Sequence, residues 1–223
     1  MAYILNIETS TKNCSVSIAN DGELICLKEI NTGGYSHAEK LHPFIHDCLL
    51  ESKLDFSQID AVCVGKGPGS YTGLRIGVSA AKGFCFANDI PLIAINSLEI
   101  LAHSTDIDNG FIVPLIDARR MEVYSSVFSN QKEKVRETQA EIIDNESFNE
   151  YLEKGAVYFL GDGAEKCKEI INHKNAHFID SHFPSAKNMV QISYEKYKKN
   201  DVENVAYFEP FYLKDFVATK QKK

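Results

Sequence analysis

The chain has 223 residues, of which 44% are hydrophobic and 25% are charged, a composition typical of a folded globular protein. Its net charge of −7 argues against a protein that binds nucleic acid through a generally basic surface. The apolar runs are far shorter than a membrane span of about 20 residues, and Asn6, Glu8 and Lys12 interrupt the start where a signal peptide would lie.

The first hundred residues predict an α/β domain. Alternating apolar residues predict a three-stranded antiparallel meander. The apolar runs that follow, which glycines separate, predict two helices that each connect to a further strand, and these two strands are expected to be parallel. Ser36 is the expected N-cap of the first helix, with Glu39 as its capping-box partner. In chain order we expect strands at 3–10, 14–19 and 23–30, a helix at 37–52, a strand at 57–67, a helix at 73–88, a strand at 91–96, and a helix with a polar turn at 97–110.

The second half of the chain again places strands before helices, so it predicts a second domain with duplicated topology. We expect domains at 1–103 and 104–223, with the last helix and the tail packing back on the first domain. The expected elements are strands at 111–119, 121–129 and 132–138, a helix at 146–155, a strand, turn and helix over 156–171, and a helix at 185–200.

The six cysteines form no CxxC pair, and each lies in an apolar run or beside a helical apolar position. This pattern is typical of reduced cysteine used as a small apolar side chain, so we expect a cytoplasmic protein. The lysines of 195–200 and of the tail 219–223 are typical of a solvated helix face and a frayed chain end.

Residues 65–77 read GKGPGSYTGLRIG and follow a buried strand directly. This loop matches neither the P-loop nor the GxGxxG pattern. Two interpretations stay open: an anion site at a helix N-terminus with Ser70, Thr72 and Arg75, or a turn that lets a helix pack closely. Glycines recurring in the helix that follows favour close packing against another helix, inside the domain or on a partner, because glycine in a helix otherwise costs about 1 kcal/mol.

Four segments together resemble the TsaB (YeaZ) family: ILNIETSTKNCSVSIANDGE, GKGPGSYTGLRIGVSAAKG, IPLIAINSLEILA and PLIDARRMEVYSSVFS. The likeness is close up to about residue 130. Beyond it, LGDGAEK (160–166) and EPFYLKDF (209–216) are similar to late family signatures. The resemblance implies the actin-like ATPase (ASKHA/RNase H-like) fold, with two α/β domains of duplicated β-β-β-α-β-α topology.

The resemblance also implies a function. Family members are degenerate paralogues and partners of the metal-bearing subunit TsaD, and the ATPase TsaE joins them. The expected role is a non-catalytic scaffold in the complex that transfers a threonylcarbamoyl group to adenosine 37 of ANN-decoding tRNAs. No cofactor is expected on this chain alone, ATP is used by the complex, tRNA is met only within it, and no membrane is involved. The same helices could support a homodimer of the free chain.

Two sets of site residues follow from the resemblance. The expected partner-binding residues lie on the helices at 37–52 and 73–88, and they are Leu41, Phe44, Ile45, Cys48, Leu49, Gly73, Arg75, Ile76, Gly77, Ala80 and Ala81. A Gly77→Arg change is accordingly expected to abolish complex formation without unfolding the chain. The residues of a vestigial phosphate loop are Glu8, Thr9, Ser10, Gly67, Gly69, Ser70 and Thr72. Relatives usually carry Asp-Thr-Ser where this chain has Glu8-Thr9-Ser10, which weakens a role in ATP chemistry.

No catalytic or metal-binding constellation is expected. His37, His42 and His46 on the first helix lack a carboxylate or cysteine that would complete a metal site. Asp117 and Arg119 after a buried strand are typical of a strand-end ion pair or cap. The alternative function is a stand-alone actin-fold, ATP-dependent phosphotransferase with Glu8, Thr9, Ser10 and the 67–73 loop around the nucleotide phosphates.

Overall fold

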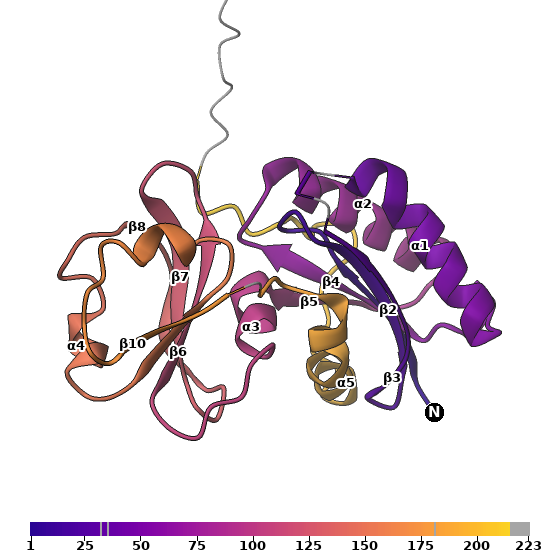
Figure 1. Cartoon of the computed structure of the whole chain (residues 1–223). Coiled ribbons are helices and arrows are strands. Elements are labelled where there is room, and N and C mark those ends of the chain that lie inside the picture. Colours follow the sequence, from indigo (N-terminus) through magenta and orange to yellow (C-terminus); the bar gives the residue numbers. More distant parts are fainter. Residues whose placement is uncertain (32, 35, 181, 215–223) are drawn as a thin grey trace, which may run out of the picture.

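The computed structural model describes residues 1–31, 33–34, 36–180 and 182–214 and contains two five-stranded mixed sheets (Figure 1). The tail lysines of 219–223 lie outside these residues. The elements of the first half are β1 (Tyr3–Glu8), β2 (Cys14–Asn20), β3 (Glu23–Ile30), α1 (His37–Ser52), the 3-10 turn η1 (Phe56–Gln58), β4 (Ala61–Gly67), α2 (Tyr71–Asn88), β5 (Leu92–Asn96) and α3 (Ser97–Ala102). Those of the second half are β6 (Phe111–Asp117), β7 (Glu122–Ser129), β8 (Lys134–Ile142), α4 (Asn149–Leu152), β9 (Val157–Leu160), η2 (Glu165–Cys167), β10 (Ala176–Ile179), η3 (Ala186–Met189) and α5 (Val190–Lys198).

The two sheets share one topology. The first has the strand order β3-β2-β1-β4-β5, and the second has the order β8-β7-β6-β9-β10, so each strand of one half has a counterpart in the other. In both sheets the first three strands are antiparallel neighbours, and the last two are parallel to the first. The predicted duplication and the actin-like fold class are therefore confirmed.

Helices cover both faces of the first sheet. The helices α1 and α2 contact β2 and β4 and bury a core that includes Leu41, Ile45, Val62 and Val78. The opposite face receives α5 and η3, and α3 lies between the two sheets in contact with β4 and β6 (Figure 1). Because α5 follows the second sheet in sequence and packs on β1 and β5 of the first, the chain crosses between the halves twice.

Several predicted elements differ in detail. The region predicted as a helix after Gly163 contains only the 3-10 turn η2, and the short strand β10 that follows it was missed. The helix predicted at 185–200 begins as the 3-10 turn η3. Ser36 makes no side-chain cap on α1, so the predicted capping box is wrong. In contrast, Ser70 caps α2 by accepting a hydrogen bond from the Gly73 N–H at 3.3 Å, and the helix starts two residues earlier than predicted.

All six cysteines are free and buried. Burial raises the pKa of the Cys85 thiol to about 11, which keeps that sulfur protonated and apolar in character near neutral pH. Within the part of the chain that the structure describes, no helix has the length and apolar character needed to cross a lipid bilayer.

Candidate functional site

The glycine-rich loop 67–70 packs against the turn that follows β1. Glu8, Thr9 and Ser10 of this turn are fully buried, and they lie where β1, β4 and the start of α2 meet. The Ser70 N–H donates to the Ser10 carbonyl at 2.6 Å, and the Thr9 hydroxyl donates to the Gly73 carbonyl at 2.8 Å. The structure therefore brings together the residues predicted as a phosphate loop, but in direct contact with one another.

The glycines of this region make that contact possible. A Cβ atom at Gly69 would lie closer than 3.0 Å to the Ser10 carbonyl oxygen, and one at Gly73 would lie closer than 3.0 Å to the Thr9 carbonyl oxygen. A Cβ atom at Gly65 would meet the Glu8 carboxylate in the same way. Close packing is thus the reason for these glycines, as one of the two interpretations held, but the neighbour is the chain's own β1–β2 turn.

Gly77 belongs to the same packed set, because a Cβ atom there would lie closer than 3.0 Å to the Thr9 Oγ1 atom. The expectation that Gly77→Arg leaves the fold intact is therefore wrong, since a long side chain at this position has to displace the buried turn. The glycine of α2 that does face open space is Gly83, where an added Cβ atom would have no neighbouring atom within 4 Å.

Backbone N–H groups of the loop already have acceptors inside the chain. The Gly67 N–H donates to Ser97 Oγ at 3.2 Å, the Gly73 N–H to Ser70 Oγ at 3.3 Å, and the Ser70 N–H to the Ser10 carbonyl. A phosphate cradle needs free N–H groups that converge on open space. These contacts disfavour nucleotide binding at the loop.

Glu8 is the one carboxylate of this cluster, and its environment favours the neutral acid. Its Oε1 atom accepts a hydrogen bond from the Ser10 N–H at 2.5 Å, and the Ser97 hydroxyl lies 3.5 Å from Oε2. Burial raises the pKa of Glu8 above its ordinary value, and the hydrogen bonds to the carboxylate offset this only in part. A charge at Glu8 is therefore unfavourable in the folded chain.

The raised pKa predicts how stability depends on pH. The folded state holds the Glu8 proton to higher pH than the unfolded state, so this group lowers stability as pH rises above the ordinary glutamate value near 4.5. Each unit of upward shift costs about 1.4 kcal/mol once the group is ionised. We expect Glu8→Gln to flatten the loss of unfolding free energy as pH rises above 4.5, as measured by urea unfolding.

The matched control for this pH series is Glu51→Gln. The pKa of Glu51 is lowered by its hydrogen bond from Lys28, so this exposed carboxylate cannot cause a loss of stability with rising pH. A Glu8→Gln variant with the same pH slope as the wild type would show that Glu8 carries no charge penalty.

The histidines of α1 do not converge. His37 is buried, with Nε2 2.8 Å from the Thr11 carbonyl oxygen, and burial lowers its pKa. His42 packs its ring edge on Phe84, and His46 lies on the surface beside Asp47. Among the residues that the structure describes, no group of three or more His, Cys, Asp and Glu side chains is placed to hold a metal ion.

The predicted partner-binding residues divide into a buried set and an accessible set. Those that the chain's own core covers are Leu41, Ile45, Cys48, Gly73, Gly77 and Ala81. Those that remain exposed or half-buried are Phe44, Leu49, Arg75, Ile76 and Ala80. An apolar stripe on an amphipathic helix faces the core by default, and only the accessible set is available to a partner.

The outer surface of the two helices carries further residues outside the predicted partner-binding set, and of these the sequence analysis missed Phe86 altogether. Leu50 of α1 is 62% exposed and Phe86 of α2 is 85% exposed. On α2, Ser79, Gly83 and Phe86 recur at helical spacing along one exposed stripe. A phenylalanine on the same helical stripe as Ser79 and Gly83 is the sequence signal that could have pointed to this face. Only the structure shows that these positions of α2 point outward.

The C-terminal segment packs against the start of α2. The Phe211 N–H donates to the Lys66 carbonyl at 2.7 Å, and the Tyr212 ring lies 4.8 Å from the Tyr71 ring at the start of α2. Beside them a surface hollow of about 500 Å³ is lined by Tyr71, Thr72, Arg75, Ile76 and Ser79. Thr72 and Arg75, the candidates for an anion site, thus line the helix surface rather than the buried turn.

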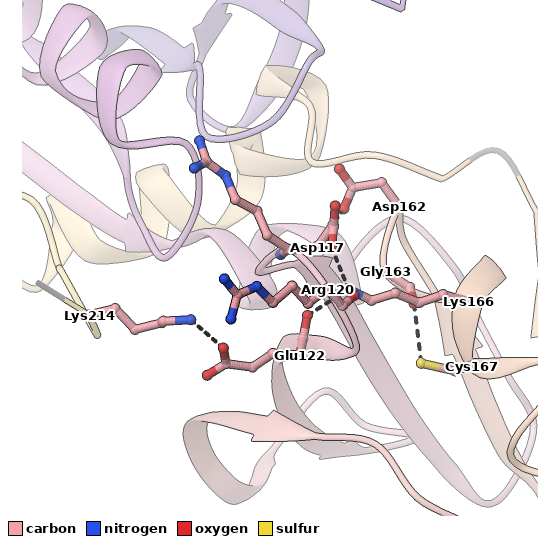
Figure 2. Close-up of polar contacts among 9 residues, drawn as sticks. Asp117, Arg120, Glu122, Asp162, Gly163, Lys166, Cys167 and Lys214 are labelled. Carbon is pink, nitrogen blue, oxygen red and sulfur yellow. Dashed lines mark hydrogen bonds and ion pairs between the residues drawn. The ribbon is translucent and has the colours of Figure 1, made fainter. Parts of the chain in front are cut away.

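In the second half, Asp117 holds the tight turn between β6 and β7. Its Oδ1 atom accepts a hydrogen bond from the Arg119 backbone N–H at 3.0 Å and pairs with the Lys166 ammonium (Figure 2). Asp117 is therefore a cap at the strand end, but its ionic partner is Lys166 and not the Arg119 side chain. The lysine lies 49 residues further along the chain, and no local pattern identifies it.

Comparisons with known proteins agree with this architecture. The family model described as TsaD, tRNA N6-adenosine threonylcarbamoyltransferase, matches residues 32–222. The chain is 30% identical over 233 residues to the tRNA threonylcarbamoyladenosine biosynthesis protein TsaB of Haemophilus influenzae, covering 98% of this chain and 96% of that one. It is 28% identical to the protein of the same name from Escherichia coli, with 98% and 97% covered.

Solved structures show the same likeness. A Pseudomonas aeruginosa protein described as similar to the peptidase YEAZ has a TM-score of 0.83 at 25% identity and covers 96% of this chain and 100% of its own. A second structure, described as YeaZ from Pseudomonas aeruginosa, has a TM-score of 0.79 with the same identity and coverage.

Proposed function

Since the chain belongs to the TsaB (YeaZ) family, we propose that it acts in tRNA threonylcarbamoyladenosine biosynthesis as a subunit without a catalytic site of its own. In this proposal the chain activates a TsaD-type catalytic paralogue, which transfers the threonylcarbamoyl group to adenosine 37 of ANN-decoding tRNAs. A TsaE-type ATPase uses the ATP of the complex.

The observation that carries the proposal is the close packing of the glycine-rich loop against the turn at Glu8, Thr9 and Ser10. A nucleotide phosphate at this turn would need open space and free N–H groups that converge on it. Here Gly69 and Gly73 bring the loop and α2 into contact with the carbonyl groups of Ser10 and Thr9. The N–H groups of Gly67, Ser70 and Gly73 bind protein acceptors. Burial of Glu8 favours its neutral form. These features support a subunit role over the phosphotransferase alternative.

The accessible face of α1 and α2 supports the proposed docking site. It combines small residues, which let another helix approach closely, with an exposed apolar ring at Phe86 and an exposed Leu50. A paralogue with the same fold would present an equivalent pair of helices, so the two pairs can pack face to face. The same geometry would support a homodimer when the paralogue is absent.

Two measurements test the proposal. Titration of the isolated chain with MgATP is expected to give no heat, and threonylcarbamoylation of tRNA by the reconstituted proteins is expected to stop when this chain is omitted. Micromolar MgATP binding by the chain alone would instead favour the phosphotransferase, as would modification that proceeds at an unchanged rate without the chain.

A further inference from the structure

The turn between β6 and β7 presents two adjacent arginines on left-handed backbone. Arg119 and Arg120 have φ angles of 71° and 54°, and both side chains are exposed. The turn is closed by hydrogen bonds from the Ala118 N–H to the Glu122 carbonyl at 3.1 Å and from the Glu122 N–H to the Arg119 carbonyl at 3.2 Å. Backbone bonding therefore fixes the position from which both guanidinium groups project.

Two of the acidic residues around this turn pair with lysines, and the third, Asp162, accepts a hydrogen bond from the Asp117 N–H at 3.0 Å. Asp117 pairs with Lys166, whose ammonium also donates to the Arg120 and Glu122 carbonyls at 2.9 and 2.6 Å. Glu122 pairs with Lys214 (Figure 2). Figure 2 shows the Arg120 guanidinium without any such contact. Because Asp117 and Glu122 form their ion pairs with lysines, neither carboxylate neutralises Arg119 or Arg120.

This placement is unusual among the arginines of the chain, of which there are four. Arg136 pairs with Glu141 at 2.5 Å, and Arg75 lies over the Tyr71 ring at 5.4 Å. Within the described ranges, the guanidinium groups of Arg119 and Arg120 have no hydrogen bond or ion pair. In a chain with a net charge of −7, an unneutralised arginine pair is a local exception that needs its own explanation.

The backbone conformation adds to the argument. Residues with a positive φ angle are usually glycine or asparagine, because a longer side chain costs about 1–2 kcal/mol in this region. Nothing in the packing requires arginine here, since both side chains are exposed.

We propose that Arg119 and Arg120 bind phosphate groups of the RNA backbone, so that the β6–β7 turn is a contact surface for tRNA in the assembled complex. Guanidinium groups match phosphate oxygens with two parallel N–H donors each. This inference rests on the proposed function, because the proposed complex is what brings tRNA to the chain. Lys214, which pairs with Glu122, adds a further positive charge beside the turn.

A free nucleotide fits the turn less well than an RNA backbone. Nucleotide sites are concave and enclose the base, whereas the side chains of Arg119 and Arg120 are both exposed. Backbone phosphates of RNA are instead read by exposed basic side chains without an enclosing pocket. An acidic segment of a protein partner would also meet the charge of the turn, so the experiment has to separate these ligands.

The test uses the complex of this chain with its catalytic paralogue and a double variant, Arg119→Asn with Arg120→Gly. Asparagine and glycine suit left-handed backbone, so the Tm of the chain is expected to equal or exceed that of the wild type. The dissociation constant for tRNA is expected to rise about tenfold, and the slope of log affinity against log salt is expected to fall by about 1 to 2.

The matched control removes two other exposed charges, with Lys174→Gln and Lys199→Gln, and is expected to leave affinity and salt slope unchanged. Equal tRNA binding by the arginine variant and the wild type would overturn the inference. So would loss of the protein complex on a sizing column, which would assign the turn to a protein partner. Micromolar MgATP binding by the wild-type chain that the arginine variant lacks would likewise overturn it and assign the turn to a nucleotide. Failure of the wild-type chain to form a complex with the catalytic paralogue would instead refute the proposed function itself.

Discussion

Gly73→Ala is expected to destabilise the chain by about 3 kcal/mol or more, among the largest effects that one added methyl group can have. The new Cβ atom would lie closer than 3.0 Å to the Thr9 carbonyl oxygen, and this neighbour is backbone that cannot rotate away. The Thr9 hydroxyl also donates to the Gly73 carbonyl, so a shift of α2 breaks that bond as well. Urea unfolding of the two proteins measures the difference.

Gly83→Ala on the same helix is the matched control. No atom lies within 4 Å of a Cβ atom at Gly83, so the methyl group meets open space. Alanine is the better helix former, and the variant is expected to gain about 0.5–1 kcal/mol. The same substitution thus has opposite signs ten residues apart in α2. A Gly73→Ala variant as stable as the wild type would contradict the packing account of the glycine-rich loop.

Gly83→Arg is expected to abolish binding of the chain to its catalytic paralogue and to leave the fold intact. The position is exposed and unobstructed, so arginine fits the free chain. In the proposed complex it lies in the stripe with Ser79 and Phe86, where a partner helix packs closely. Burial of an unpaired charge there costs several kcal/mol, which is enough to remove a micromolar complex. Co-purification on a sizing column measures binding, and a circular dichroism melt measures the fold.

Gly155→Arg is the corresponding control in the second half. Gly155 follows α4 and also has no atom within 4 Å of a Cβ position, so the same substitution adds the same charge away from the proposed interface. It is expected to bind the paralogue as the wild type does. Retention of the complex by Gly83→Arg, with both variants folded, would place the interface elsewhere.

The fold could be predicted well from sequence where hydrophobic periodicity is long. The helix α1 has the predicted bounds, and the parallel pairing of β4 with β5 followed from the crossover between two buried strands. Short elements were harder, because β10 has only four residues and η2 only three. Elements of this length carry too few residues for a period to emerge, and tertiary contacts decide their conformation.

The candidate site shows a sharper limit. The sequence identified Gly73 and Gly77 as residues with a packing role, but it could not tell that their neighbour is Thr9, more than sixty residues earlier. It also treated the whole apolar stripe of α1 as a partner surface, although Leu41 and Ile45 face the core. Which face of a helix points outward depends on how the helix packs on the sheet. The unpaired arginines of the β6–β7 turn could not be identified from the sequence either, because Asp117 and Glu122 pair with lysines that are distant in the chain.

The central claim is that this chain works as a subunit and not as a stand-alone enzyme. The most direct test is the molar mass of the chain mixed with the TsaD-type paralogue of the same organism, measured by light scattering on a sizing column. We predict one species whose mass contains both chains in equal numbers. Two separate peaks under gentle salt, together with micromolar binding of MgATP to this chain alone, would contradict the claim.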